Sequence, residues 1–167
     1  MHDMTRKNLE EAYAGESMAF MKYTIWADRA EKEGKPVVAR LFRAVAAAEK
    51  VHAANHWRAL GNIGETASNL EHAVEGENYE VDEMYPAFEA VAEHQGEKNA
   101  LRSMHFALEV EKIHAKMYAK AKEAAHAGGD AEIGVLHVCP VCGYTVEGTT
   151  PDTCPICGAK KELFKEF

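Results

Sequence analysis

The chain has 167 residues, of which 47% are hydrophobic, and it carries a formal net charge of −8 at pH 7. This length allows one ordinary domain and a small additional module, and the hydrophobic fraction is high enough to build a core. The acidic residues are spread along the chain, which argues against a nucleic-acid partner and against an anionic membrane surface. No apolar run approaches membrane-spanning length.

The two ends of the chain indicate the compartment. Residues 1–8 are polar and lack the apolar stretch of a secretory signal peptide. All four cysteines lie near the C-terminus in two Cys-x-x-Cys pairs, which is typical of a metal site rather than of a disulfide framework. We therefore expect a cytoplasmic protein.

Apolar residues recur at spacings of three and four over the first 60 residues. This pattern predicts one helix over about residues 5–33 and a second over about residues 36–60. Glu16 lies in the apolar stripe of the first helix, and Glu49 and His52 lie on the inward stripe of the second. Apolar residues expected to face the core include Tyr23, Ala27, Leu41, Val45, Phe88 and Val91.

Two further helices are predicted in the second half of the chain. The third begins at a capping box that starts at Ser68, with Thr66 as the alternative start. Pro86 should kink this helix rather than end it, because the apolar pattern continues beyond it. The fourth helix covers about residues 97–127, and two glycines then mark a domain boundary.

Two tetrapeptides of the form Glu-x-x-His, Glu49 to His52 and Glu111 to His114, lie on these helices. A spacing of three places both side chains on one helix face. Such motifs on two helices, with single carboxylates from two others, hold two iron or manganese ions in a four-helix bundle. Glutamates on the predicted inward faces are Glu16, Glu49, Glu77, Glu80 and Glu111. Ion pairs with lysine or arginine would explain any one of them, but the whole set favours a dinuclear metal site.

The C-terminal segment lacks the helical pattern, and its sequence predicts short strands and turns around the cysteines. The pattern Cys-x2-Cys-x11-Cys-x2-Cys is formed by Cys139, Cys142, Cys154 and Cys157. It predicts a tetrahedral sulfur site, which holds either zinc or a single iron. About 30 residues cannot build a stable core unaided, so the metal should also be structural. We place a helical domain at residues 1–134 and a metal-bound module at residues 135–167.

The order of these motifs resembles rubrerythrin over nearly the whole chain. The resemblance is carried by Gly15-Glu16-Ser17, both Glu-x-x-His motifs, Gly76-Glu77-x-x-Glu80 before Met84-Tyr85-Pro86, and the paired cysteines. It implies a mainly α fold, in which a ferritin-like four-helix bundle is followed by a small rubredoxin-like β/turn module. It also implies two iron ions in the bundle and one iron at the cysteines, where zinc can substitute, with Phe164 in the aromatic core of the module.

The resemblance further implies a ligand scheme for the two irons. Glu49 and Glu111 would bridge them, Glu16 and His52 would serve the first, and Glu77 and His114 the second. Glu80 would bind the first iron in the oxidised state and yield it to His52 on reduction. The five carboxylates carry five negative charges, against four positive charges on two ferrous ions and six on two ferric ions. An additional anionic ligand is therefore favoured on oxidation.

Other residues are assigned by the same comparison. Tyr23 and Tyr85 would hydrogen-bond the ligand carboxylates, although packing in an aromatic core is the alternative role for both. His56, His94 and His105 match no ligand of the family, so we expect them not to bind metal.

The implied activity is that of a peroxidase for oxidative-stress defence, which reduces hydrogen peroxide to water with electrons relayed through the rubredoxin-like iron. The sequence contains no Gly-x-Gly-x-x-Gly nucleotide fingerprint, so we expect an external donor such as a rubredoxin or an NAD(P)H-dependent reductase. One alternative is a ferritin-like ferroxidase that binds iron. Another is a structural adapter in which a zinc ribbon follows the helices.

The connection between the second and third helices predicts a homodimer. In ferritin-like bundles these two helices run parallel, so the connection must return along the second helix, which is about 37 Å long. Residues 61–67 reach only about 25 Å when fully extended. Either the third helix runs antiparallel to the second, or the first helix pair packs on the second pair of a partner chain. We favour the exchange, because it preserves the ligand arrangement of the family.

Overall fold

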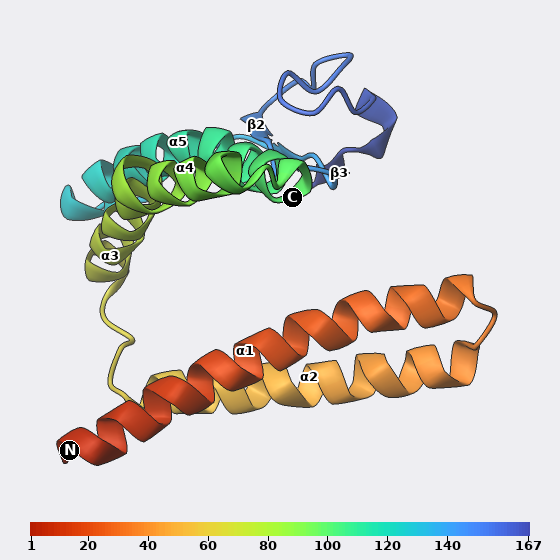
Figure 1. The fold of residues 1–167 in the computed structure, drawn as a ribbon. Helices are drawn as coiled ribbons and strands as arrows, with labels where there is room; N and C mark the ends of the chain where they lie inside the picture. The colour runs from red at the N-terminus through yellow and green to blue at the C-terminus, as the bar shows by residue number, and fades with distance from the viewer. The chain divides into compact units, whose positions relative to one another are not determined.

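The computed structural model describes all 167 residues, which divide into two compact units, Met1–Gly64 and Glu65–Phe167 (Figure 1). The first unit contains two helices, and the second contains the remaining helices and a three-stranded sheet. The structure contains no helix that is both long enough and apolar enough to cross a membrane.

The first unit is a helical hairpin of α1 (Asp3–Lys32) and α2 (Pro36–Ala59). The two helices pack along a seam of small side chains, and three alanines of α2 in this seam are seven residues apart. These buried alanines are Ala27 and Ala30 on α1 and Ala39, Ala46 and Ala53 on α2. A seven-residue repeat keeps one helix face against its partner, and alanine allows the backbones to approach closely. The seam therefore differs from the predicted inward stripe of α2.

The second unit begins with α3 (Thr66–Tyr79), which continues through a π-helical turn, η1 (Glu80–Met84), into α4 (Tyr85–Gln95). Both α3 and α4 pack on α5 (Lys98–His126). The predicted capping box at Ser68 is wrong, because α3 starts at Thr66 and its start has no side-chain cap. The expected disturbance near Pro86 takes the form of the π turn, which leaves Pro86 in the first turn of α4, where its missing N–H is tolerated.

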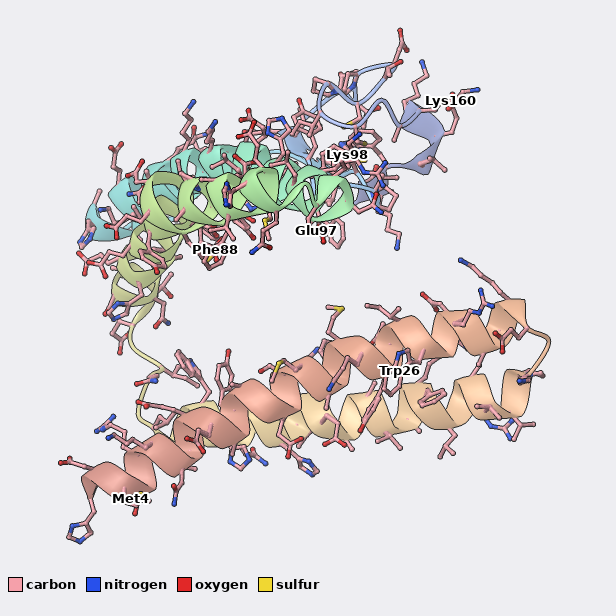
Figure 2. The ribbon with its side chains drawn as sticks, in the orientation of Figure 1. Met4, Trp26, Phe88, Glu97, Lys98 and Lys160 are labelled. Carbon is pink, nitrogen blue, oxygen red and sulfur yellow. The ribbon has the colours of Figure 1, made fainter.

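Several residues that we expected in the core are exposed. The exposed fractions are 62% for Leu41 on α2, and 47% and 54% for Phe88 and Val91 on α4. Figure 2 labels Phe88 on α4. The physical reason is that a single partner helix covers only one face of an amphipathic helix. In the hairpin, the covered face of each helix is the one that carries the buried alanines.

The C-terminal module contains the strands β1 (Leu136–Val138), β2 (Thr145–Glu147) and β3 (Lys165–Glu166), with one 3-10 turn, η2 (Lys161–Leu163). The strand order is β2-β1-β3, and both pairings are antiparallel. The rings of Tyr144 and Phe164 meet edge to face with centroids 6.2 Å apart. This contact confirms the expected place of Phe164 in the small aromatic core.

The module lies against α5 within the second unit. Val110 of α5 is only 2% exposed, and a side-chain carbon built on Gly143 would lie 3.7 Å from it. Gly143 has a φ of 86°, which favours glycine, and it immediately precedes the segment that leads into β2. The first cysteine turn of the module, which ends at Gly143, is therefore held beside the middle of α5.

Candidate metal centres

The four cysteines form one cluster. Their sulfur atoms all lie within 4.8 Å of one another, and the Cys139–Cys157 and Cys142–Cys154 sulfur pairs are each 3.6 Å apart. A tetrahedral ion with metal–sulfur bonds of about 2.3 Å has sulfur–sulfur edges of about 3.8 Å. The cluster therefore has the dimensions of a site in which four cysteines hold a single metal ion.

The two halves of this cluster are built alike. The amides of Cys139 and Cys154 donate to the carbonyl oxygens five residues later, of Tyr144 and Ala159, at 2.9 and 2.7 Å. The amides of Gly143 and Gly158 donate back to the carbonyl oxygens of Cys139 and Cys154 at 2.9 and 3.0 Å. Each Cys-Pro-x-Cys-Gly turn thus presents one buried and one half-buried cysteine to the cluster.

The thiols of the cluster need a cation to ionise together. Burial raises the pKa of the Cys142 thiol, and hydrogen bonds with the other three cysteines raise it further. Burial likewise raises the pKa of Cys157. Burial by itself would raise the pKa of Cys154, but hydrogen bonds from the backbone N–H groups of Cys157 and Ile156 hold this pKa below its usual value. A bound metal ion supplies the missing positive charge, so the donor set fits the group that the sequence predicts.

A second ligand group lies within the α1–α2 hairpin. It consists of Glu16 from α1 with Glu49 and His52 from α2. His52 Nδ1 lies 2.9 Å from Glu49 Oε2 and 3.8 Å from Glu16 Oε1. Two carboxylates and one imidazole make a donor set suited to iron.

A third ligand group lies within the second unit and repeats this composition. It consists of Glu77 from α3 with Glu111 and His114 from α5. His114 Nδ1 lies 2.7 Å from Glu111 Oε2. Each helix pair therefore brings together one Glu-x-x-His motif, whose two side chains share a helix face, and one glutamate from the neighbouring helix.

Glu80 and Tyr85 lie close to the third group but do not belong to it. Burial and the charge of Glu111 raise the pKa of Glu80, and the charge of His114 lowers it. Burial and the charges of Glu80, Glu111 and Glu77 raise the pKa of the Tyr85 hydroxyl. Tyr85 therefore keeps its proton among three carboxylates and can donate a hydrogen bond there.

The carboxylates of the third group repel one another when no cation is bound. Burial, a hydrogen bond with Glu111 and the charges of Glu111 and Glu80 raise the pKa of Glu77 to about 7. Such a cluster is costly unless protons or metal ions neutralise it. The donor types and this repulsion both fit divalent or trivalent iron.

Thr145 is a site residue that the sequence did not reveal. Its hydroxyl lies 2.9 Å from His114 Nε2 and donates to the carbonyl oxygen of Gly143, also at 2.9 Å. Thr145 is buried at the start of β2, 31 positions after His114 in the sequence. No local pattern marks this threonine, because the contact depends on how the module packs on α5.

The remaining predicted residues are not members of these three ligand groups. The ring of Tyr23 packs near Trp26 and Phe42, with centroids 5.5 and 6.1 Å away. His105 is exposed and lies 3.5 Å from Glu89, so it has an ion-pair partner outside the clusters. His56 and His94 belong to none of the three ligand groups.

Comparisons with known proteins agree with this organisation. The sequence model of the family described as Rubrerythrin matches residues 7–122, and that of the rubrerythrin, rubredoxin-like domain matches residues 137–165. Rubrerythrin-2 of Clostridium acetobutylicum is 42% identical, and the alignment covers 98% of this chain and 97% of that protein. Nigerythrin of Nitratidesulfovibrio vulgaris is 33% identical, with 98% and 86% covered.

A solved structure of a relative is also similar to this chain. The fully reduced, all-ferrous state of nigerythrin aligns with a TM-score of 0.57 and 33% sequence identity, covering 98% of this chain and 86% of that one.

The fold and the ligand groups define a ferritin-like diiron carboxylate protein with an additional cysteine-bound iron in a rubredoxin-like module. Proteins of this class include oxidoreductases and iron-binding proteins. With family matches over both parts of the chain and relatives above 30% identity over nearly its full length, the chain belongs to the rubrerythrin family.

Proposed function

We propose that this protein is a peroxidase of oxidative-stress defence that reduces hydrogen peroxide to water. The balanced reaction consumes two electrons and two protons for each peroxide and releases two water molecules. Iron held by the carboxylates and histidines would supply the electrons that cleave the O–O bond. The residues of the chain hold the metals, shape the water-poor site and deliver protons.

The observation that carries this proposal is the packing of the cysteine module on α5. Val110 and His114 are one helical turn apart on α5. Val110 lies beside Gly143, the last residue of the first cysteine turn, and His114 Nε2 lies 2.9 Å from the hydroxyl of Thr145, two residues further on. An iron-storage protein gains nothing from a redox centre at this place. A reductase gains a short route by which electrons reach the diiron ligands.

For the ligands we propose the roles that the resemblance to the family implies. Glu49 and Glu111 would be shared between the two irons, Glu16 and His52 would hold the first, and Glu77 and His114 would hold the second. The surroundings of the two histidines support the exchange of His52 for Glu80. The His52 side chain is 53% exposed and its Nε2 has no hydrogen bond in the structure, whereas His114 is 29% exposed and its Nε2 lies 2.9 Å from the Thr145 hydroxyl.

Tyr85 and Tyr23 are proposed to hydrogen-bond the ligand carboxylates. The charges of three carboxylates act on the hydroxyl of Tyr85, which supports its role. We further propose a cytoplasmic protein that receives electrons from a rubredoxin or an NAD(P)H-dependent reductase, with the domain boundary between residues 134 and 135.

The test of the proposed activity is an anaerobic peroxide titration of the iron-loaded, fully reduced protein. We expect each addition of peroxide to be consumed and the red ferric-thiolate colour to return as electrons leave the cysteine site. Iron handling would instead be favoured if peroxide left the colour unchanged while the protein took up excess ferrous iron in air. A colourless, zinc-containing protein without either activity would favour the structural adapter.

Replacing Glu80 with alanine should slow steady-state peroxide turnover by about tenfold or more, while much of the iron is retained. The reason is that Glu80 supplies the additional negative charge that the oxidised pair needs. Glu83→Ala is the matched control, because Glu83 is an exposed carboxylate of the same π turn. Wild-type turnover in Glu80→Ala, at wild-type metal content, would show that Glu80 has no switching role.

The measured helix bounds also support an exchanged homodimer. Glu49 lies ten residues before the end of α2 at Ala59, and Glu77 lies eleven residues after the start of α3 at Thr66. At 1.5 Å per residue these offsets are about 15 and 17 Å, so parallel helices with aligned ligands need a connection of about 32 Å. The connection over residues 60–65 reaches at most about 25 Å.

We therefore propose that the hairpin of one protomer packs on α3–α5 of its partner. The exposed apolar residues Leu41, Phe88 and Val91 would then be covered. α1 exposes a second apolar row, Met18, Met21 and Ile25, on the face opposite Glu16, which would serve contact between two such bundles. An antiparallel arrangement of α2 and α3 within one chain is the alternative outcome.

A further inference from the structure

We infer that Thr145 is a positioning residue that locks the His114 ring for metal binding and links it to the cysteine site of the same chain. The part of the inference that concerns electron delivery rests on the proposed function. The part that concerns the orientation of the His114 ring does not depend on that function. Nothing in the known motifs of the sequence singles out this threonine.

The hydrogen bonds around Thr145 fix the direction of each proton. The Thr145 hydroxyl donates its single proton to the carbonyl oxygen of Gly143 at 2.9 Å. Its lone pairs therefore remain to accept the N–H of His114 Nε2, also at 2.9 Å. Nδ1 of the same ring faces Glu111 Oε2 at 2.7 Å, on the side of the carboxylates. This arrangement places the ring proton on Nε2 and leaves Nδ1 to bind the metal.

A serine could make both hydrogen bonds, whereas valine, which has nearly the shape of threonine, could make neither. The methyl group of threonine adds packing in a buried position at the start of β2. Such an outer hydrogen bond orients a metal-binding histidine and increases the basicity of its ligating nitrogen. Thr145 can thus be tested without a change in side-chain volume.

The same contacts form a route between the two ligand sets. The route runs from the His114 ring to the Thr145 hydroxyl, to the Gly143 carbonyl oxygen and through one peptide bond to Cys142. With iron bound at both sites, each electron delivered along this route would leave the cysteine-bound iron oxidised from ferrous to ferric and the diiron pair reduced by one electron. The external one-electron donor then restores the ferrous state. A cysteine site would therefore serve the diiron site that contains His114 of its own chain.

The first measurement uses full-length protein loaded with zinc, which is diamagnetic and does not react with peroxide. We expect nuclear magnetic resonance to show an Nε2–H proton of His114 that exchanges with water about tenfold or more slowly in wild type than in Thr145→Val. Thr145→Ser should restore the slow exchange. Thr149→Val, which changes an exposed threonine of the same module, is the matched control and should behave as wild type.

The second measurement follows the return of ferric-thiolate colour after one equivalent of peroxide is added to reduced, iron-loaded protein. The return should be about tenfold or more slower in Thr145→Val and recover in Thr145→Ser. Wild-type proton exchange and a wild-type rate in Thr145→Val would overturn the inference. If even the wild type failed to consume peroxide, the proposed function would fail, while the zinc measurement would still decide the role of Thr145.

Discussion

Replacing Cys139 and Cys142 together with serine is expected to abolish electron delivery from a protein donor, so that steady-state peroxide reduction falls to background. The physical reason is the loss of half of the sulfur ligands at the only cysteine cluster, one of them fully buried. A diiron site that is reduced chemically beforehand should still consume one equivalent of peroxide. The measurement compares donor-driven turnover with this single turnover in the same preparation.

A folding defect in the module must be separated from the loss of redox chemistry. Wild-type protein with zinc at the cysteines and iron in the bundle is the matched control, because zinc keeps the tetrahedral site but undergoes no redox change. We expect it to lose donor-driven turnover as the double variant does. Turnover that survives in both proteins would make the cysteine site purely structural.

Co-expression of a Glu49→Ala chain with a Glu111→Ala chain is expected to restore one working diiron site per mixed dimer. In an exchanged dimer, one bundle combines the altered hairpin with the altered α5 and receives both changes. The other bundle combines two unaltered parts. Each variant expressed alone carries one change in every bundle and should bind iron pairs poorly, since both residues are proposed bridging ligands.

The mixed dimer can be isolated by placing a different affinity tag on each chain. We expect about half of the wild-type diiron content and peroxide turnover. A mixed dimer of Glu16→Ala with Glu49→Ala is the matched control, because both changes lie in the hairpin and neither arrangement gives an intact site. A Glu49→Ala and Glu111→Ala dimer that assembles but binds no iron pair would show that each chain closes its own bundle.

The sequence by itself determined the features that depend on local spacing. The bounds of the helices follow from apolar periodicity and lie within a few residues of the observed ones. The two Glu-x-x-His motifs share a helix face because three residues make about one turn. The two cysteine turns have matching backbone hydrogen bonds, since each set of bonds lies within six consecutive residues.

Tertiary structure decided which helix faces are buried. Leu41 and Ala46 are both apolar residues of α2, and periodicity alone gave the inward position to Leu41. The structure buries Ala46 instead, because close approach of α1 and α2 favours small side chains at the seam. The π turn before Pro86 is likewise a compromise among the backbone hydrogen bonds of a whole helix, so a lone proline predicted a kink but not its form.

Thr145 shows most clearly the difference between what the sequence determines and what only the tertiary structure decides. As one residue of a short strand it carries no signal in the sequence, and its partner His114 lies 31 positions away. The packing of the module on α5, where Gly143 lies beside Val110 and Glu147 pairs with Lys120, brings the hydroxyl to the imidazole. The sequence therefore determined which residues can bind metal, through spacings within single helices and turns. Contacts between elements decided how the diiron ligands and the cysteine site of one chain are connected.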